Sequence, residues 1–186
     1  MALLRLPASV TRFDDRADRA WEPLRGVAPI DRLMYGASEA ANFSLLWHAT
    51  GVALTVAQGR DPRSLLRLST LLTVESLAVN QGVKRLFERP RPEQDPLERR
   101  LRLRQPSTSS FPSGHASAAT VAAGVLSEMD PARKPLWWSM AAVVATSRLH
   151  VRIHHASDVM AGALVGTAIG VGLRRLWPPR VSEVDG

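Results

Sequence analysis

The chain has 186 residues, no cysteine and a formal net charge of +7. This length fits one domain, and the absence of cysteine excludes disulfide bonds and thiolate metal sites. No recognisable DNA- or RNA-binding motif accompanies the positive charge, so we predict no nucleic-acid partner. Basic loops beside anionic lipid headgroups explain the charge more economically.

The distribution of charge along the chain is more informative than its average. The mean hydropathy of -0.06 resembles that of a soluble protein. However, the charges are bunched and leave long uncharged runs, a pattern typical of helices that cross a bilayer. We predict an all-α integral membrane helical bundle with about five spanning helices and an N-terminal amphipathic interfacial helix. A single domain would comprise an interfacial segment 1–35, a helical core 36–178 and a tail 179–186.

The first predicted elements are a surface helix and a helical hairpin. Residues 9–24 mix basic, acidic and apolar side chains, which favours an amphipathic helix at the membrane surface. A solvated, partly disordered terminus is the alternative. Residues 40–59 are uncharged and long enough to span a bilayer, and residues 64–87 return as a second span after a turn.

Two polar residues interrupt this hairpin. His48 and Glu75 are about equally far from the turn, so an antiparallel hairpin would bring them to similar depth. An unpaired carboxylate in lipid is costly. We therefore hypothesise that both face inward and form a buried hydrogen-bonded or ionic pair.

The second half of the chain predicts a polar loop and three more spans. Residues 93–104 are too charged to be core, and they form either a loop over the site that contacts headgroups or a plain solvated loop. The spans are expected at residues 113–129, 136–149 and 156–177. Glycines at four-residue spacing give the last helix a smooth face, which we expect to pack within the bundle: Gly162, Gly166 and Gly170.

A basic motif lies at the end of the second span. Lys84 and Arg91 are seven residues apart, which places them on one side of a helix if the helix persists. Pro90 and Pro92 predict that it ends at about Arg89.

The third span begins with the sequence Pro112-Ser113-Gly114-His115. The first turn of a helix offers unpaired N–H groups and the positive end of the macrodipole, which suit a phosphate or another oxyanion. Gly114 would let the anion approach the backbone, Ser113 could add a hydroxyl, and His115 could donate or accept a proton. The same string also fits a simple helix cap.

A third polar motif lies between the last two spans. Arg148 is followed six residues later by His154, and Asp158 follows His154 by four residues. Residues at i and i+4 share a helical face, so Asp158 could accept the proton on one imidazole nitrogen and leave the other free as a nucleophile.

In order and spacing, the three motifs resemble the signature of the type 2 phosphatidic acid phosphatase superfamily. This superfamily includes membrane lipid phosphate phosphatases, bacterial acid phosphatases and vanadium-dependent haloperoxidases. The motifs cover residues 84–158, and the flanking apolar helices fit the membrane branch.

The resemblance implies a role for each motif residue. His154 would attack phosphorus and form a phosphohistidine, Asp158 would hold its tautomer, and His115 would protonate the leaving oxygen and then activate water. The phosphate oxygens would be bound by three cationic side chains and two residues at the helix start: Lys84, Arg91, Arg148, Ser113 and Gly114. This scheme needs no metal or other cofactor.

The order of the spans predicts that all three motifs meet at helix ends on one membrane face. His150 and His155 lie nearby but outside the signature, so we interpret them as packing or rim residues. Counting Lys and Arg residues on each side favours a cytoplasmic site. Many members of the family that recycle polyprenyl carriers face outward, which leaves the orientation open. We expect a multi-pass protein of the cell (plasma or inner) membrane, and the sequence predicts no oligomeric state.

These observations favour a membrane phosphatase that hydrolyses a lipid phosphomonoester or diphosphate. Its candidate substrates are phosphatidic acid, phosphatidylglycerol phosphate and polyprenyl phosphates or diphosphates. One alternative is a non-catalytic membrane protein that binds anionic lipid headgroups. Another is a vanadium haloperoxidase, because vanadate can occupy the same cradle as phosphate.

Overall fold

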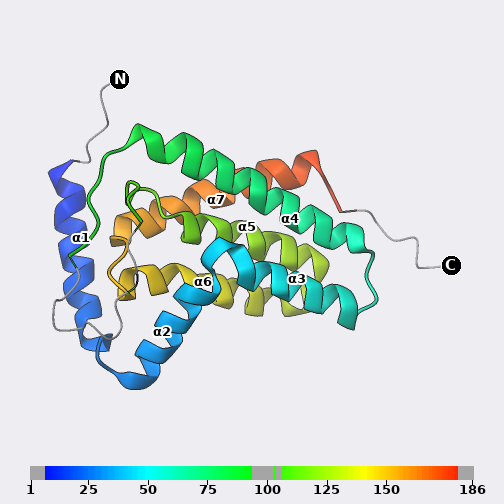
Figure 1. The fold of residues 1–186 in the computed structure, drawn as a ribbon, viewed down its shortest axis with the longest axis horizontal. Helices are drawn as coiled ribbons and strands as arrows, with labels where there is room; N and C mark the ends of the chain where they lie inside the picture. Colours follow the sequence, from blue (N-terminus) through cyan, green and yellow to red (C-terminus); the bar gives the residue numbers. More distant parts are fainter. Residues whose placement is uncertain (1–6, 94–102, 104–105, 180–186) are drawn as a thin grey trace.

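The computed structural model describes residues 7–93, 103 and 106–179, and within them the chain forms seven α-helices and no β-strand. Helices α3 to α7 form an elongated bundle, with α1 and α2 at one end (Figure 1). The helices are α1 (Ala8–Trp21), α2 (Ala28–Ala40), α3 (Leu45–Ala57), α4 (Pro62–Leu77), α5 (Gly114–Met129), α6 (Lys134–His150) and α7 (Ala156–Leu176). The predicted all-α class is confirmed.

Helix α5 is the centre of the bundle. Eleven of its sixteen residues are buried, and it packs against α4, α6 and α7. Its small and β-branched residues let these neighbours approach closely. The surrounding core consists of larger apolar side chains, among them Trp47, Leu68, Leu72 and Val144.

The glycine face of α7 packs on α5. A Cβ atom at Gly162 would lie 2.3 Å from the Ser113 carbonyl oxygen, and one at Gly166 would lie 2.3 Å from the Ser117 carbonyl oxygen. Side chains at these positions would therefore meet backbone. The prediction that this face packs within the bundle is confirmed.

The N-terminal third contains more helix than the sequence predicted. The first predicted helix is confirmed as α1, but α2 was not predicted, and the first predicted span starts later, at Leu45. Phe43 and Ser44 have φ values of 52° and 59°, which break the helical path between α2 and α3. This break places the short segment Asn42–Ser44 against the start of α5.

The last part of the second predicted span is not a regular α-helix. After α4 the chain makes a π-helical turn at Ala78–Gly82 and a 3₁₀ turn at Val83–Leu86, and Phe87 is extended. The helical path therefore ends before Arg89, the predicted end. A π-helical turn widens the helix and changes the direction of the residues that follow, which here include Lys84.

The hypothesis of a His48–Glu75 pair is wrong. His48 Nδ1 lies 3.1 Å from the Ser69 hydroxyl. The Glu75 carboxylate is buried and has no hydrogen-bond partner among the described residues. Equal depth in a hairpin does not fix the rotation of each helix, so the two side chains face different neighbours.

Among the described residues one helix, α7, is long and apolar enough to cross a membrane. Helices α3, α4, α5 and α6 have 13, 16, 16 and 17 residues, fewer than the roughly 20 that a spanning helix needs. All five predicted spans thus contain helix, and one of them has the length and composition of a membrane span. The greater part of the predicted loop at residues 93–104 and of the tail at 179–186 lies outside the described residues.

Candidate active site

The three sequence motifs meet at the end of the bundle where α1 lies (Figure 1). Helix α4 runs toward this end, α5 and α7 begin there, and α6 ends there. A hydrogen bond of 3.0 Å from Ser113 N to the Asp158 carbonyl oxygen joins the starts of α5 and α7. The predicted convergence of the motifs is confirmed.

The turn after α6 fixes the position of His154. The Arg148 carbonyl oxygen accepts hydrogen bonds from Ile153 N and His154 N, both at 3.1 Å. Arg152 has a φ of 51°, which reverses the chain toward the start of α7. As a result the His154 side chain is buried, with 3% of its surface exposed.

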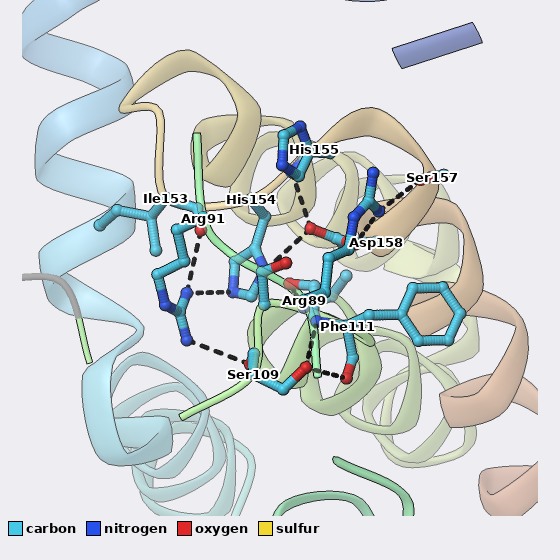
Figure 2. A network of polar contacts seen from close by, with 12 residues as sticks. Arg89, Arg91, Ser109, Phe111, Ile153, His154, His155, Ser157 and Asp158 are labelled. Carbon is cyan, nitrogen blue, oxygen red and sulfur yellow. Dashed lines mark hydrogen bonds and ion pairs between the residues drawn. The ribbon is translucent and has the colours of Figure 1, made fainter. Parts of the chain in front are cut away.

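Asp158 faces the imidazole of His154, as predicted (Figure 2), although His154 lies in the turn before α7 and the two residues do not share a helical face. The distance from His154 Nδ1 to Asp158 Oδ2 is 3.6 Å, which is longer than a hydrogen bond. The same oxygen accepts a hydrogen bond of 2.8 Å from His155 N. Asp158 therefore accepts a hydrogen bond from the residue that caps α7 and faces the histidine ring with the same oxygen.

Arg91 reaches the other side of the ring. Its Nη1 atom lies 3.3 Å from His154 Nε2 (Figure 2). A guanidinium can only donate, so Nε2 must accept, and a neutral ring then carries its proton on Nδ1. The Nε2 lone pair thus points toward the Arg91 guanidinium.

Backbone carbonyl groups hold Arg91 in this position. Its guanidinium donates to the carbonyl oxygens of Pro106, Thr108, Ser109 and Ile153 at 2.9 to 3.3 Å. Because the helical path ends at Leu86, Arg91 reaches His154 along an extended segment, whereas the spacing had suggested a common helical face with Lys84.

Three cationic side chains gather around the imidazole. Burial, together with the nearby charges of Arg91 and Arg148, lowers the pKa of Lys84 to about 8. Burial also lowers the pKa of Arg91, and the Asp158 charge opposes this effect. So much positive charge in a buried site favours an anionic ligand.

The same environment keeps His154 neutral. Burial lowers the pKa of His154 to about 3; the Asp158 carboxylate opposes the shift, and the charges of Arg91 and Arg148 add to it. At neutral pH the ring is therefore uncharged and keeps the lone pair on Nε2.

The start of α5 supplies an imidazole and backbone donors. Ser113 is the helix cap: its Oγ accepts a hydrogen bond from Ala116 N at 3.4 Å. Its own N–H donates to the Asp158 carbonyl oxygen. Among the described residues the Gly114 and His115 amides have no acceptor. A Cβ atom at Gly114 would lie 3.0 Å from Asn80 Oδ1 and 3.7 Å from Lys84 Nζ, so glycine allows this close approach.

His115 is held by the break between α2 and α3. Its Nε2 atom lies 3.1 Å from Asn42 Oδ1, and the Asn42 amide nitrogen donates to Glu39. This orientation makes the Asn42 oxygen the acceptor, so His115 Nε2 carries a proton. His115 also lies within electrostatic reach of His154 and Arg148.

Two residues missed by sequence reasoning complete the site. Arg89 donates to Asp158 and also to Asp14 of α1. Arg89 and Arg91 both precede a proline, which favours an extended backbone at both residues. Residues two apart in an extended segment have their side chains on the same side, so the sequence did indicate that Arg89 lies near the site. Asp14 gave none, because the N-terminal segment carries several similar acids.

His150 and His155 have the packing and rim positions predicted for them. His150 is buried, accepts from Trp21 Nε1 at 3.1 Å and contacts Asp31 at 2.8 Å, which ties α6 to the N-terminal segment. His155 is the cap of α7, and its Nε2 atom lies 3.3 Å from the Pro90 carbonyl oxygen.

Fold and site together define an all-α protein with a buried histidine between a carboxylate and a cluster of cations. Residues 64–182 match the PAP2 superfamily, and the chain belongs to this family. The resemblance predicted from the three motifs is confirmed.

Two kinds of known protein are similar to the chain. Over 88 residues it is 32% identical to decaprenylphosphoryl-5-phosphoribose phosphatases of two Mycobacterium tuberculosis strains, an alignment that covers 47% of this chain and 48% of each relative. The match thus spans about half the length of these curated relatives. A transmembrane PAP2-type phosphatidylglycerolphosphate phosphatase from Bacillus subtilis has the same fold, with a TM-score of 0.68, 23% identity, and coverage of 91% of this chain and 87% of that chain.

Proposed function

We propose that the protein is a metal-independent phosphatase that hydrolyses a lipid phosphomonoester or diphosphate through a phosphohistidine on His154. The observation that carries the proposal is the neutral imidazole, whose Nε2 lone pair faces Arg91 while Nδ1 faces Asp158. A nucleophile activated in this way, beside cations that bind the phosphate oxygens, is what phosphoryl transfer to a side chain requires.

The reaction would proceed in two balanced steps. His154 Nε2 forms a bond to phosphorus as the bond to the leaving oxygen breaks, and His115 in its doubly protonated form donates one proton to that oxygen and becomes neutral. In the second step His115 takes a proton from water, the water oxygen attacks phosphorus, and the P–N bond breaks to release phosphate. Lys84, Arg91 and Arg148 would stabilise the charge on the phosphate oxygens in both steps.

The lipid nature of the substrate and the membrane location belong to the same proposal. Both kinds of similar protein carry names of phosphatases that act on lipid-linked phosphates. We propose a single-domain, multi-pass protein of the cell membrane with about five spans, and α1 at the bilayer surface. The phosphate headgroup of a lipid in the bilayer would then enter a site at the membrane face.

The test is phosphate release from a panel of lipid phosphates in detergent with EDTA, with His154→Ala protein as the blank. The panel contains phosphatidic acid, phosphatidylglycerol phosphate, and polyprenyl phosphate and diphosphate. We expect release from at least one of them, because the proposed chemistry uses no metal. If the wild type releases no phosphate from any lipid, the headgroup-binding alternative replaces the proposal.

Lys84 should give the reaction an alkaline limb. A lysine is charged below its pKa, so phosphate binding by Lys84 should be lost as the pH rises through about 8. We expect kcat/KM of the wild type to fall above this pH and the limb of Lys84→Arg to move to higher pH, because arginine stays charged. Initial rates between pH 6 and 10 measure kcat/KM of the two proteins. If kcat/KM falls at the same alkaline pH in both, Lys84 is not the group whose deprotonation limits the reaction.

A further inference from the structure

Arg89 joins two buried carboxylates that are far apart in the sequence. Its Nη1 atom donates to Asp158 Oδ1 and its Nη2 atom to Asp14 Oδ2. The side chains of Asp14 and Asp158 are 3% and 0% exposed, and that of Arg89 is 12% exposed, so water screens these contacts little. The planar guanidinium fixes the direction of both acceptors and holds Asp158 from the side away from His154 (Figure 2).

Asp14 also holds the first turn of α7. Its Oδ1 atom accepts from Ser157 N and its Oδ2 atom accepts from Ser157 Oγ, both at 2.8 Å. The N–H groups of a first helical turn have no partner within their own helix, so Asp14 caps α7 from another helix. One side chain of α1 thus contacts both Arg89 and the turn that carries Asp158.

This arrangement gives the two oxygens of Asp158 different partners. Oδ1 is bound by Arg89, whereas Oδ2 accepts from His155 N and faces His154 Nδ1. The last torsion of an aspartate is broad, so the carboxylate needs external contacts to keep one oxygen toward the ring. Arg89 supplies such a contact, and Asp14 holds Arg89.

We propose that Asp14 is a positioning residue for the His154 nucleophile and acts through Arg89 and Asp158; this inference rests on the function proposed above. Helix α1 precedes the residues that match the superfamily, 64–182, yet it completes the orientation of the catalytic histidine. Removing the Asp14 charge leaves Arg89 with one carboxylate instead of two, which lets the guanidinium and Asp158 shift. Asp14 does not contact the cations around His154. Removing its charge should therefore lower kcat more than it weakens substrate binding.

The test compares Asp14→Asn with Asp15→Asn in the full chain. Asparagine keeps the shape of Asp14 and an acceptor for Ser157 N, but it removes the charge opposite Arg89. Asp15 is the exposed neighbour on α1, so its variant makes the same charge change at the surface. We expect Asp14→Asn to lower kcat about tenfold with KM within about threefold, and Asp15→Asn to leave both unchanged. Arg89→Lys keeps the positive charge but lacks the planar guanidinium that donates to two carboxylates at once, so it should also lower kcat.

Two results would overturn the inference. One is a wild-type kcat in Asp14→Asn. The other is a loss of activity that disappears when rates are expressed per folded protein, measured by thermal unfolding and size-exclusion chromatography, because Asp14 would then only stabilise the fold. An inactive wild type, or full activity in His154→Ala, contradicts the proposed function instead, so the two failures are distinguishable.

Discussion

The His154→Ala variant should release phosphate at least about 10⁴-fold more slowly than the wild type, because it lacks the atom that would bond to phosphorus. His154 is buried between Asp158 and Arg91, and alanine leaves the backbone contacts of this turn in place. We therefore expect the variant to fold and to keep its affinity for lipid phosphate. Loss of turnover without loss of binding identifies a residue that acts in the chemical step.

A second readout separates the nucleophile from an acid or base. Wild-type protein mixed with a ³²P-labelled substrate and quenched should contain a phosphoprotein that is stable in alkali and labile in acid, as expected for a phosphohistidine. His154→Ala should contain none. The matched control is His48→Ala, which removes an imidazole that contacts Ser69 in the hairpin and leaves the site intact. Equal labelling of wild type and His154→Ala would assign the nucleophile to another residue.

The sequence predicted the parts of the fold that depend on local pattern. The start of α5 at Gly114 and the glycine face of α7 follow from helix capping and from four-residue spacing. The sequence also predicted that Asp158 faces His154, but not the reason: His154 lies in the turn before α7, so the two residues do not share a helical face, and Asp158 also accepts from His155 N. Local pattern was therefore sufficient for the helix starts and for the pairing, and insufficient for the turn that makes the pair.

The sequence could not predict contacts that depend on the orientation of separate helices. Asp14 is one of several acids in the N-terminal segment, and only the packing of α1 against α7 selects it for Arg89. Similarly, His48 and Glu75 were predicted at equal depth, but the rotation of α3 and α4 turns His48 toward Ser69 and leaves the Glu75 carboxylate without a hydrogen-bond partner among the described residues. The π-helical turn that ends α4 gave no recognised signal, so the path from Lys84 to Arg91 was predicted as helix.

The Gly162→Ala variant should both destabilise the fold and inactivate the site. The added Cβ atom would lie 2.3 Å from the Ser113 carbonyl oxygen and 3.1 Å from the Ser113 N and C atoms. These atoms belong to backbone that also bonds to Asp158, so no side chain can move aside to relieve the clash. We expect a loss of about 1–3 kcal/mol in the free energy of unfolding, as for an overpacked core.

The effect on activity follows from where the clash occurs. Helix α5 carries His115 and α7 carries Asp158, and the hydrogen bond from Ser113 N to the Asp158 carbonyl sets their separation at this end. Pushing the helices apart by about 1 Å would move His115 away from His154, which in the proposed mechanism costs on the order of 10²-fold in kcat. The site should therefore lose activity even in the fraction of protein that remains folded.

Gly172→Ala is the matched control on the same helix. A Cβ atom at Gly172 would have no heavy atom within 4 Å, and alanine favours a helix interior over glycine by about 1 kcal/mol. This variant should be as stable as the wild type or more stable, with unchanged kcat. Chemical unfolding and phosphate release on the three proteins test the difference. If Gly162→Ala keeps wild-type stability and kcat, the close packing of α7 on Ser113 does not set the geometry of the active site.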